Sequence, residues 1–255
     1  MKEKLKKYLK MHLKNAGVLG SFEKKSMLGS SDKFWEGRML QWNPKGYWSV
    51  FPMPDREELK AYYSQSYWQA RGGKRCVVTR RDLAQFVELK ALYPQKTFSS
   101  VLNFGAGHGG VSVLFQLEGA KVTNIEPSGL DIGLEWECYD AYEDATGSFD
   151  LVYGSHSLEH LTDVEAFFED IKQVMKPGAV LYFEVPNCHQ DNYKSFPDGK
   201  IHIPHTYYFT RDFFRNLPYR EKINRTYHSI DKVNFKILDD DSGHIIRYSA
   251  ESQSS

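Results

Sequence analysis

Leucine and lysine positions follow a helical period at the start of the chain. Leu5, Leu9 and Leu13 recur every four positions, and six lysines lie around them within residues 1–16. This spacing places the leucines on one narrow apolar stripe and predicts a short amphipathic helix over residues 1–16. A basic amphipathic helix can lie on an anionic membrane surface, but such a stripe more often docks on its own domain, and we expect docking.

The next segment lacks a regular period. Trp35–Trp68 is dense in aromatic residues and contains three prolines, which favours an irregular segment anchored by rings. Asp55 is followed three residues later by Glu58, the spacing of a capping box. A helix is therefore expected from about residue 55.

Beyond residue 80 the pattern changes to one helix and then to short apolar runs between helix-length segments. The helix is predicted over Arg80–Leu92 and is ended by Pro94. Strands are predicted at Ser100–Phe104, Lys121–Glu126, Trp136–Tyr139, Phe149–Gly154 and Ala179–Val185. This alternation is typical of an α/β fold with a doubly wound, mostly parallel sheet.

Two more short strands are expected near the C-terminus. Phe235–Leu238 and His244–Ser249 flank the polar run 239–243, which predicts a hairpin and an antiparallel C-terminal edge. The organisation expected from these patterns is a helical and aromatic cap segment over residues 1–95, followed by an α/β core over residues 96–255.

Composition excludes several classes of protein. The 255 residues are 41% hydrophobic and 26% charged with a net charge of +0, which excludes disorder over the whole length and a general attraction to nucleic acid. The three cysteines form no C-x-x-C pair, as expected for free thiols in a reducing compartment. No run approaches the ~18 apolar residues of a spanning helix, so we expect no stable membrane insertion and a cytoplasmic protein.

A glycine-rich turn follows the first predicted strand of the core. Gly105, Gly107 and Gly110 fit the dinucleotide pattern G-x-G-x-x-G, whereas Gly105, Gly107 and Gly109 fit the G-x-G-x-G loop of enzymes that bind S-adenosylmethionine. Glu126 ends the next strand about 20 residues later, where a carboxylate can accept hydrogen bonds from ribose hydroxyls. Both cofactors contain that ribose, so the loop alone leaves the two open.

Later motifs distinguish between the two cofactors. They are SFDLVY at 148–153, SLEHLTD at 157–163, MKPGAVL at 175–181 and VPN at 185–187. Together with the glycine loop, this order resembles the class I S-adenosylmethionine-dependent methyltransferases. The run 202–210 resembles the histidine-containing entry to the family's last large helix. The run 51–68 is similar to the segment that precedes this domain in the methyltransferases of sugar and polysaccharide biosynthesis.

The resemblance implies a cofactor site made of Gly105, Gly107, Gly109, Glu126, Asp140, Ala141 and Ser155. In the family the glycines lie under the methionine part, the acid equivalent to Glu126 holds the ribose, and the acid equivalent to Asp140 accepts from the adenine amino group. Two residues depart from the family pattern. Asn103 stands where an acid is usual, and Ala179 replaces the second glycine of the PGG turn.

A hydroxyl acceptor requires a base, and histidine suits that task near neutral pH. The candidates are His160, His205 and His202, with His189 as a weaker one; each could instead be a structural histidine. His108, inside the glycine loop, is expected to fix the loop.

The run His156 to His160 also spells H-x-x-E-H, the pattern of a zinc peptidase. It directly follows a strand at the carboxyl edge of the sheet, which argues against a peptidase. A divalent cation held by His156, Glu159 and His160 is an alternative; we predict no metal.

The sequence therefore predicts an S-adenosylmethionine-dependent O-methyltransferase acting on a sugar or polysaccharide precursor, including phosphorylated or nucleotide-linked ones. The expected partner is a small-molecule or carbohydrate acceptor, and a homodimer stays open. Three alternatives remain. An N-methyltransferase would need no base. A nicotinamide-dependent oxidoreductase would share the glycine loop but leaves the later motifs unexplained. A catalytically silent S-adenosylmethionine-binding protein would fit the altered Asn103.

Overall fold

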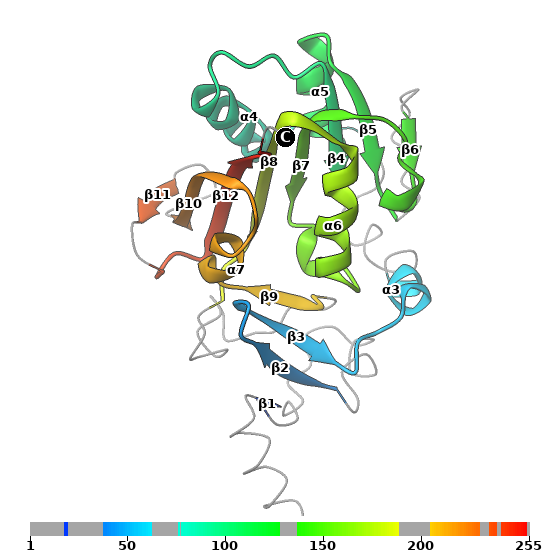
Figure 1. Ribbon diagram of the computed structural model, residues 1–255, viewed down its shortest axis with the longest axis vertical. Helices are drawn as coiled ribbons and strands as arrows, with labels where there is room; N and C mark the ends of the chain where they lie inside the picture. Colours follow the sequence, from blue (N-terminus) through cyan, green and yellow to red (C-terminus); the bar gives the residue numbers. More distant parts are fainter. Residues whose placement is uncertain are drawn as a thin grey trace, which may run out of the picture.

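The structure is a computed structural model, and it describes residues 18–19, 38–62, 76, 78–127, 137–188, 205–229, 235–238 and 241–253. The helix predicted over 1–16, both ends of Trp35–Trp68, His189 and His202 lie outside these residues. The described chain forms a large sheet flanked by helices, with a smaller sheet at one end (Figure 1).

The large sheet has, within the described residues, eight strands in the order β11-β10-β12-β8-β7-β4-β5-β6. Their bounds are β4 Ser100–Phe104, β5 Lys121–Ile125, β6 Glu137–Tyr139, β7 Phe149–Ser155, β8 Met175–Pro186, β10 Arg220–Ser229, β11 Phe235–Leu238 and β12 Ile245–Glu251. The pairs from β8 to β6 are parallel, and those that join β8, β12, β10 and β11 are antiparallel. The predicted α/β class and mostly parallel sheet are therefore confirmed, including the antiparallel C-terminal edge.

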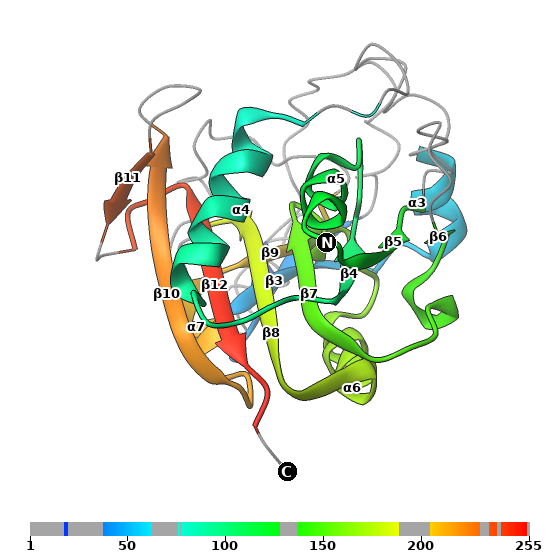
Figure 2. The same cartoon turned by 90° about the horizontal axis from the view of Figure 1, so that it is seen from above.

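Alternating side chains of the central strands fill two separate cores. Val101 and Leu151 belong to one cluster, and their neighbours Leu102 and Val152 belong to the other. The bordering helices are α4 Arg80–Leu92, α5 Gly110–Leu117, α6 Val164–Val174 and α7 Arg211–Arg215. Figure 2 shows α4 and α5 on one face of the sheet and α6 and α7 on the other. Strands buried on both faces read as continuous apolar runs, as the sequence of this core does.

Helix α4 has the bounds that the sequence predicts. Thr79 and Asp82 form a capping box at its start: Thr79 Oγ1 accepts from Asp82 N (3.2 Å), and Asp82 Oδ2 accepts from Thr79 N (2.7 Å). The start of α3 (Arg56–Tyr62) is capped by Asp55, whose Oδ1 accepts from Glu58 N at 2.8 Å. The predicted helix after residue 55 is thus confirmed.

The aromatic segment before α3 is more regular than predicted. Strands β2 (Met39–Asn43) and β3 (Tyr47–Phe51) form an antiparallel hairpin where the sequence indicated an irregular segment. They belong to a four-stranded sheet of order β1-β2-β3-β9, which also contains β1 (Val18–Leu19) and β9 (Tyr207–Phe209). The prediction was wrong because β3 is held by β9, a strand more than 150 residues away along the chain.

The C-terminal hairpin was predicted with the wrong partners. Strand β11 pairs with β10, and β12 pairs with β10 and β8, so β10 lies between the two strands that the sequence joined. Seven register pairs bind β12 to β10 and seven bind it to β8, against four between β11 and β10. Long-range pairing outweighs the local turn, because the central position lets β12 bond on both edges.

The small sheet places one segment beside the turn that follows β7. Val50 N donates to Thr206 O (2.9 Å), and Thr206 N donates to Glu159 O (2.7 Å). Thr206 Oγ1 also donates to the same carbonyl at 2.9 Å. These bonds bring His205 next to the 3₁₀ turn Leu158–His160, 45 residues earlier in the chain.

Candidate active site

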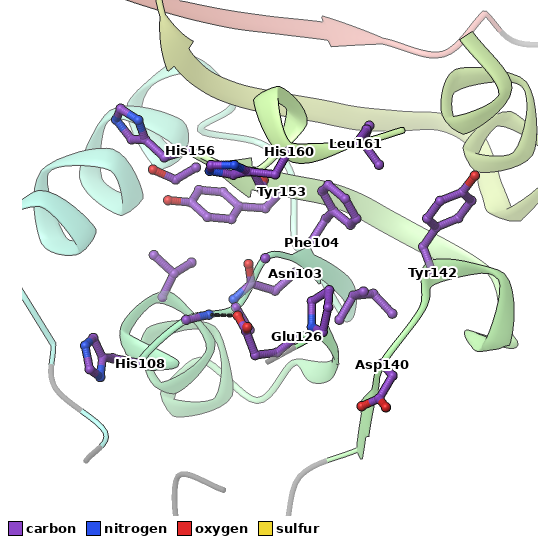
Figure 3. A pocket seen from close by; sticks show the side chains of 18 of the residues that line it. Asn103, Phe104, His108, Glu126, Asp140, Tyr142, Tyr153, His156, His160 and Leu161 are labelled. Atoms are coloured by element: carbon purple, nitrogen blue, oxygen red, sulfur yellow. Dashed lines mark hydrogen bonds between the residues drawn. The ribbon is translucent and has the colours of Figure 1, made fainter. Parts of the chain in front are cut away.

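A cavity of about 990 Å³ opens at the carboxyl ends of β4, β5 and β7. Its walls come from the glycine turn after β4 and the turn after β7 (Figure 3), and from the starts of α3 and α4. Ligands of open α/β sheets bind at this edge, outside the ends of the strands. The cavity is therefore the candidate active site.

The glycine turn follows β4 directly. Gly105 N and Ala106 N both donate to Ile125 O, at 2.9 and 3.0 Å, which fastens the turn to β5. Gly105 and Gly107 have φ of 73° and 53°, a region that favours glycine. A Cβ on Gly105 would lie 2.4 Å from Ser157 Cβ. The backbone of this turn can therefore line the cavity closely, while Ser157 packs behind it.

Glu126 stands on the same wall, at the end of β5. It is buried, and its Oε2 accepts from Gly107 N at 2.7 Å. An ionised carboxylate has about four acceptor sites, so this bond leaves capacity for ribose hydroxyls. Asp140 and Ala141 also line the cavity, and the Asp140 carboxylate lies 3.4 Å from Lys60 Nζ.

Asn103 lines the cavity and has one buried side-chain acceptor without a hydrogen-bond partner. Its Nδ2 donates to Ser112 Oγ (2.8 Å), and Ser112 Oγ donates to Asn124 Oδ1 (2.5 Å). This order of donors orients the side chain and leaves the buried Asn103 Oδ1 without a hydrogen-bond partner. A neutral acceptor thus replaces the acid that the family resemblance led us to expect.

The opposite wall carries histidines from two distant segments. Strand β7 ends at Ser155, and the 3₁₀ turn then presents His160 to the cavity, across from Glu126 in Figure 3. The rings of His160 and His205 lie edge to face, with their centroids 4.7 Å apart. The structure therefore joins two of the three predicted catalytic histidines; His202 lies outside the described residues.

Two buried carboxylates flank His156. Its Nδ1 lies 3.3 Å from Glu159 Oε1, and its Nε2 lies 3.3 Å from Glu184 Oε1. Both contacts join a ring nitrogen to a carboxylate oxygen at ion-pair distance. Burial disfavours a charged His156, but the two carboxylates outweigh it and raise its pKa to about 9.

The same contacts act on Glu159, whose side chain is 1% exposed. Burial raises the pKa of its carboxyl, but the contact with His156 opposes burial, and the pKa of Glu159 lies well below its usual range. Glu159 is thus an ionised carboxylate beside the histidine pair.

Glu159, His160 and His205 are close enough together to bind a metal cation. Among the described residues, possible ligand atoms of Glu159, His160 and His205 lie within 4.8 Å of one another. The sequence had grouped His156 with Glu159 and His160, whereas His156 lies between the two carboxylates. Because His156 already balances Glu159, we assign no metal ligands here.

Sequence reasoning found most of the cavity but missed several groups. Seven of the predicted site residues line the cavity: Gly105, Gly107, Glu126, Asp140, Ala141, Ser155 and His160. Gly109 does not line it and instead caps α5, and His205 contacts the ring of His160. Arg81, Tyr142 and Glu184 were missed. A glutamate inside the apolar run of β8 was a usable signal, because a buried charge needs partners.

Comparison with known proteins identifies the family. Residues 78–221, more than half of the chain, match the family described as "Methyltransferase domain", and the chain therefore belongs to it. The chain thus contains a methyltransferase domain with the class I fold, as its motifs led us to expect.

Curated relatives share part of this region. The ubiquinone biosynthesis O-methyltransferase of Bradyrhizobium sp. (strain ORS 278) is 30% identical over 109 residues, 38% of this chain and 42% of that protein. The enzyme of the same name from Coxiella burnetii (strain RSA 493 / Nine Mile phase I) is 27% identical over 161 residues, 56% of this chain and 65% of that protein. The matches thus span less than two thirds of these relatives. They do not support the expected sugar or polysaccharide group.

Solved structures share the fold at low identity. The 1,6-didemethyltoxoflavin-N1-methyltransferase of Burkholderia thailandensis, with bound S-adenosylhomocysteine, has a TM-score of 0.55 at 14% identity, covering 86% of this chain and 96% of that one. The N-methyltransferase NodS of Bradyrhizobium japonicum, also with S-adenosylhomocysteine, has a TM-score of 0.51 at 12% identity, covering 77% and 97%. No helix among the described residues is long and apolar enough to cross a membrane.

Proposed function

We propose that this methyltransferase transfers a methyl group to a hydroxyl of a small-molecule acceptor, with a histidine of the His160–His205 pair as the base. The observation that carries the proposal is the ring contact of 4.7 Å between these histidines, next to the ionised Glu159, on the wall opposite Glu126. The O-methyltransferase names of the curated relatives support a hydroxyl acceptor over an amine.

The cavity wall formed by the glycine turn and Glu126, the cofactor wall, has residues that fit S-adenosylmethionine. Glu126 would hold the ribose hydroxyls, Asp140 and Ala141 the adenine, and the glycine turn with Ser155 the methionine part. Asn103 Oδ1, buried and unpaired, is suited to accept a hydrogen bond from the cofactor's ammonium group. When bound, S-adenosylmethionine supplies an electrophilic methyl group.

The chain's own task is to position the acceptor, exclude water and hold one proton. A base must come within ~2.6–3.2 Å of the acceptor hydroxyl, directly or through one water. His160 lines the cavity and His205 supports it from behind, so His160 is the first candidate and His205 the second. We keep His202 as a third candidate that orients His205 or binds the acceptor, and no metal takes part.

We also propose the division into a cap segment, residues 1–95, and an α/β core, residues 96–255. Arg56 and Lys60 of α3 line the cavity with the glycine turn, which supports a role for residues 1–95 in covering the cofactor site of residues 96–255.

An acceptor screen tests the proposed function. The protein with labelled S-adenosylmethionine would be offered phenols, catechols, phosphorylated sugars, nucleotide sugars and, as the nitrogen arm, primary and secondary amines. We expect methylation of a hydroxyl compound. Transfer to amines alone would overturn the hydroxyl acceptor and the base, and a sugar or phenol product would settle the acceptor class that the comparisons leave open.

A further inference from the structure

A series of alternating charges leads from α4 to the cavity. Arg247 donates through Nη1 to Glu88 Oε2 (2.7 Å) and through Nε to Glu184 Oε2 (2.6 Å). The other oxygen of Glu184 faces His156 Nε2 at 3.3 Å, and His156 Nδ1 faces Glu159 Oε1 at 3.3 Å. The charges therefore alternate from Glu88 to Glu159, and the last of them stands beside the histidine pair.

The backbone holds His156 in this place under strain. It has φ of 54° and is the one non-glycine residue with positive φ in the described part of the chain. Its N–H donates to Glu184 O at 2.8 Å, which fixes the residue above β8. Such a conformation persists where its surroundings enforce it, and it commonly marks a functional site.

We propose that His156 is a positioning residue that carries the counter-charge of Glu159, so that the His160–His205 pair stays neutral and able to accept the acceptor's proton. The inference rests on the proposed function and deepens it. Glu159 stands beside the pair, and His156 keeps the proton of the resting enzyme on its own ring.

Among the groups around this cluster, His156 is the one whose positive charge balances the carboxylate of Glu159. The charged and titratable groups that face this cluster are Arg81 from α4, Tyr153 from β7, Glu184 from β8, Arg247 from β12, and His205 and Tyr208 at β9. Both tyrosines are neutral, because burial raises the pKa of each hydroxyl. Arg247 and Arg81 lie against Glu184. Without His156, the buried charge of Glu159 would draw a proton onto itself or onto the histidine pair.

Two substitutions should therefore move the pH profile in opposite directions. His156→Asn removes the cation and suits the positive φ, because asparagine tolerates that region. We expect the acid limb of kcat to rise by about one pH unit or more, with roughly threefold or more lower turnover at pH 7 that recovers near pH 9. Glu159→Gln removes the anion, and its acid limb should fall by a similar amount.

The double variant His156→Asn/Glu159→Gln is the sharpest arm, because it removes one charge of each sign. Its acid limb should return to within about half a unit of the parent's. Lys90→Gln, which breaks the exposed Lys90–Glu118 pair remote from the cavity, is the matched control and should leave the limb in place. A purely structural role of His156 predicts lower turnover or stability with no shift of the limb, and that result would overturn the proposal.

A second readout needs no activity. Histidine ¹³Cε1 resonances can be titrated by NMR in the folded protein, with those of His160 and His205 assigned by single His→Gln variants. Their titration should move upward in His156→Asn and downward in Glu159→Gln. If both shifts occur while His160→Gln and His205→Gln keep full turnover, the base assignment fails and the charge arrangement stands. If neither shift occurs, the inference fails irrespective of the base.

Discussion

The two walls of the cavity are built in different ways. The cofactor wall is mostly backbone: the turn after β4 is contiguous in sequence, and its amides bond Ile125 O and Glu126 Oε2. The histidine wall is mostly side chains, and Glu159, Glu184, His205 and Arg247 reach it from four separate segments. A local motif thus specifies cofactor binding, whereas tertiary packing specifies the proposed chemistry. A substitution in the cofactor wall should therefore weaken cofactor binding and spare the proposed base, whereas a substitution in the histidine wall should lower turnover and spare cofactor binding.

The largest effect on the cofactor wall is expected from Gly105→Ala. The new Cβ would meet Ser157 Cβ at 2.4 Å with φ at 73°, so clash and backbone strain add. We expect a loss of about 2–5 kcal/mol in unfolding free energy, measured by urea denaturation.

Gly119→Ala is the control for that variant. Gly119 has φ of 87° but nothing within 4 Å of an added Cβ, so it isolates the backbone term and should cost about 1–2 kcal/mol. Equal losses in the two variants would mean that the close packing of Ser157 on Gly105 is unimportant.

Glu126→Ala should weaken the cofactor wall without touching the histidines. Loss of a charged acceptor costs ~1.5–3 kcal/mol, or about 10- to 100-fold in affinity for S-adenosylhomocysteine by calorimetry. Glu126→Gln, which can still accept from Gly107 N, should fall between the parent and the alanine variant. Unchanged affinity in the folded alanine variant would remove the ribose assignment.

A smaller effect should appear in the pH dependence of stability. Because the folded pKa of His156 is raised from 6.5 to about 9, its contribution is complete below pH 6.5 and is lost as pH rises through 9. The stability advantage of the parent over His156→Asn should therefore shrink, by on the order of 1–3 kcal/mol, between pH 6 and pH 10. A constant difference across that range in urea denaturation would contradict a charged His156.

Chelation should have the smallest effect. His156 already balances Glu159, so EDTA treatment should leave methyl transfer intact, and added Mg²⁺ or Mn²⁺ should not raise it. If activity collapses with EDTA and returns with a divalent cation, Glu159, His160 and His205 would be identified as metal ligands, against our prediction.

The sequence predicted the cofactor wall much better than the histidine wall, because the first depends on local sequence and the second on tertiary packing. The bounds of α4 were predicted from the local pattern and Pro94, and the glycine turn follows from local backbone requirements. The strands of the C-terminal edge were found, but their pairing was not, because β10 enters between β11 and β12. The contact of His156 with Glu184 depends on two strands meeting in the sheet, and neither residue carries a sign of the other in its local pattern.

The division between the two walls is tested most directly by His160→Ala and His205→Ala, each examined for turnover and for S-adenosylhomocysteine binding in one preparation. The account predicts that at least one of them lowers kcat by ~100-fold or more, since the base is lost, while the dissociation constant stays within a few-fold of the parent's. Near-normal turnover in both folded variants would contradict it.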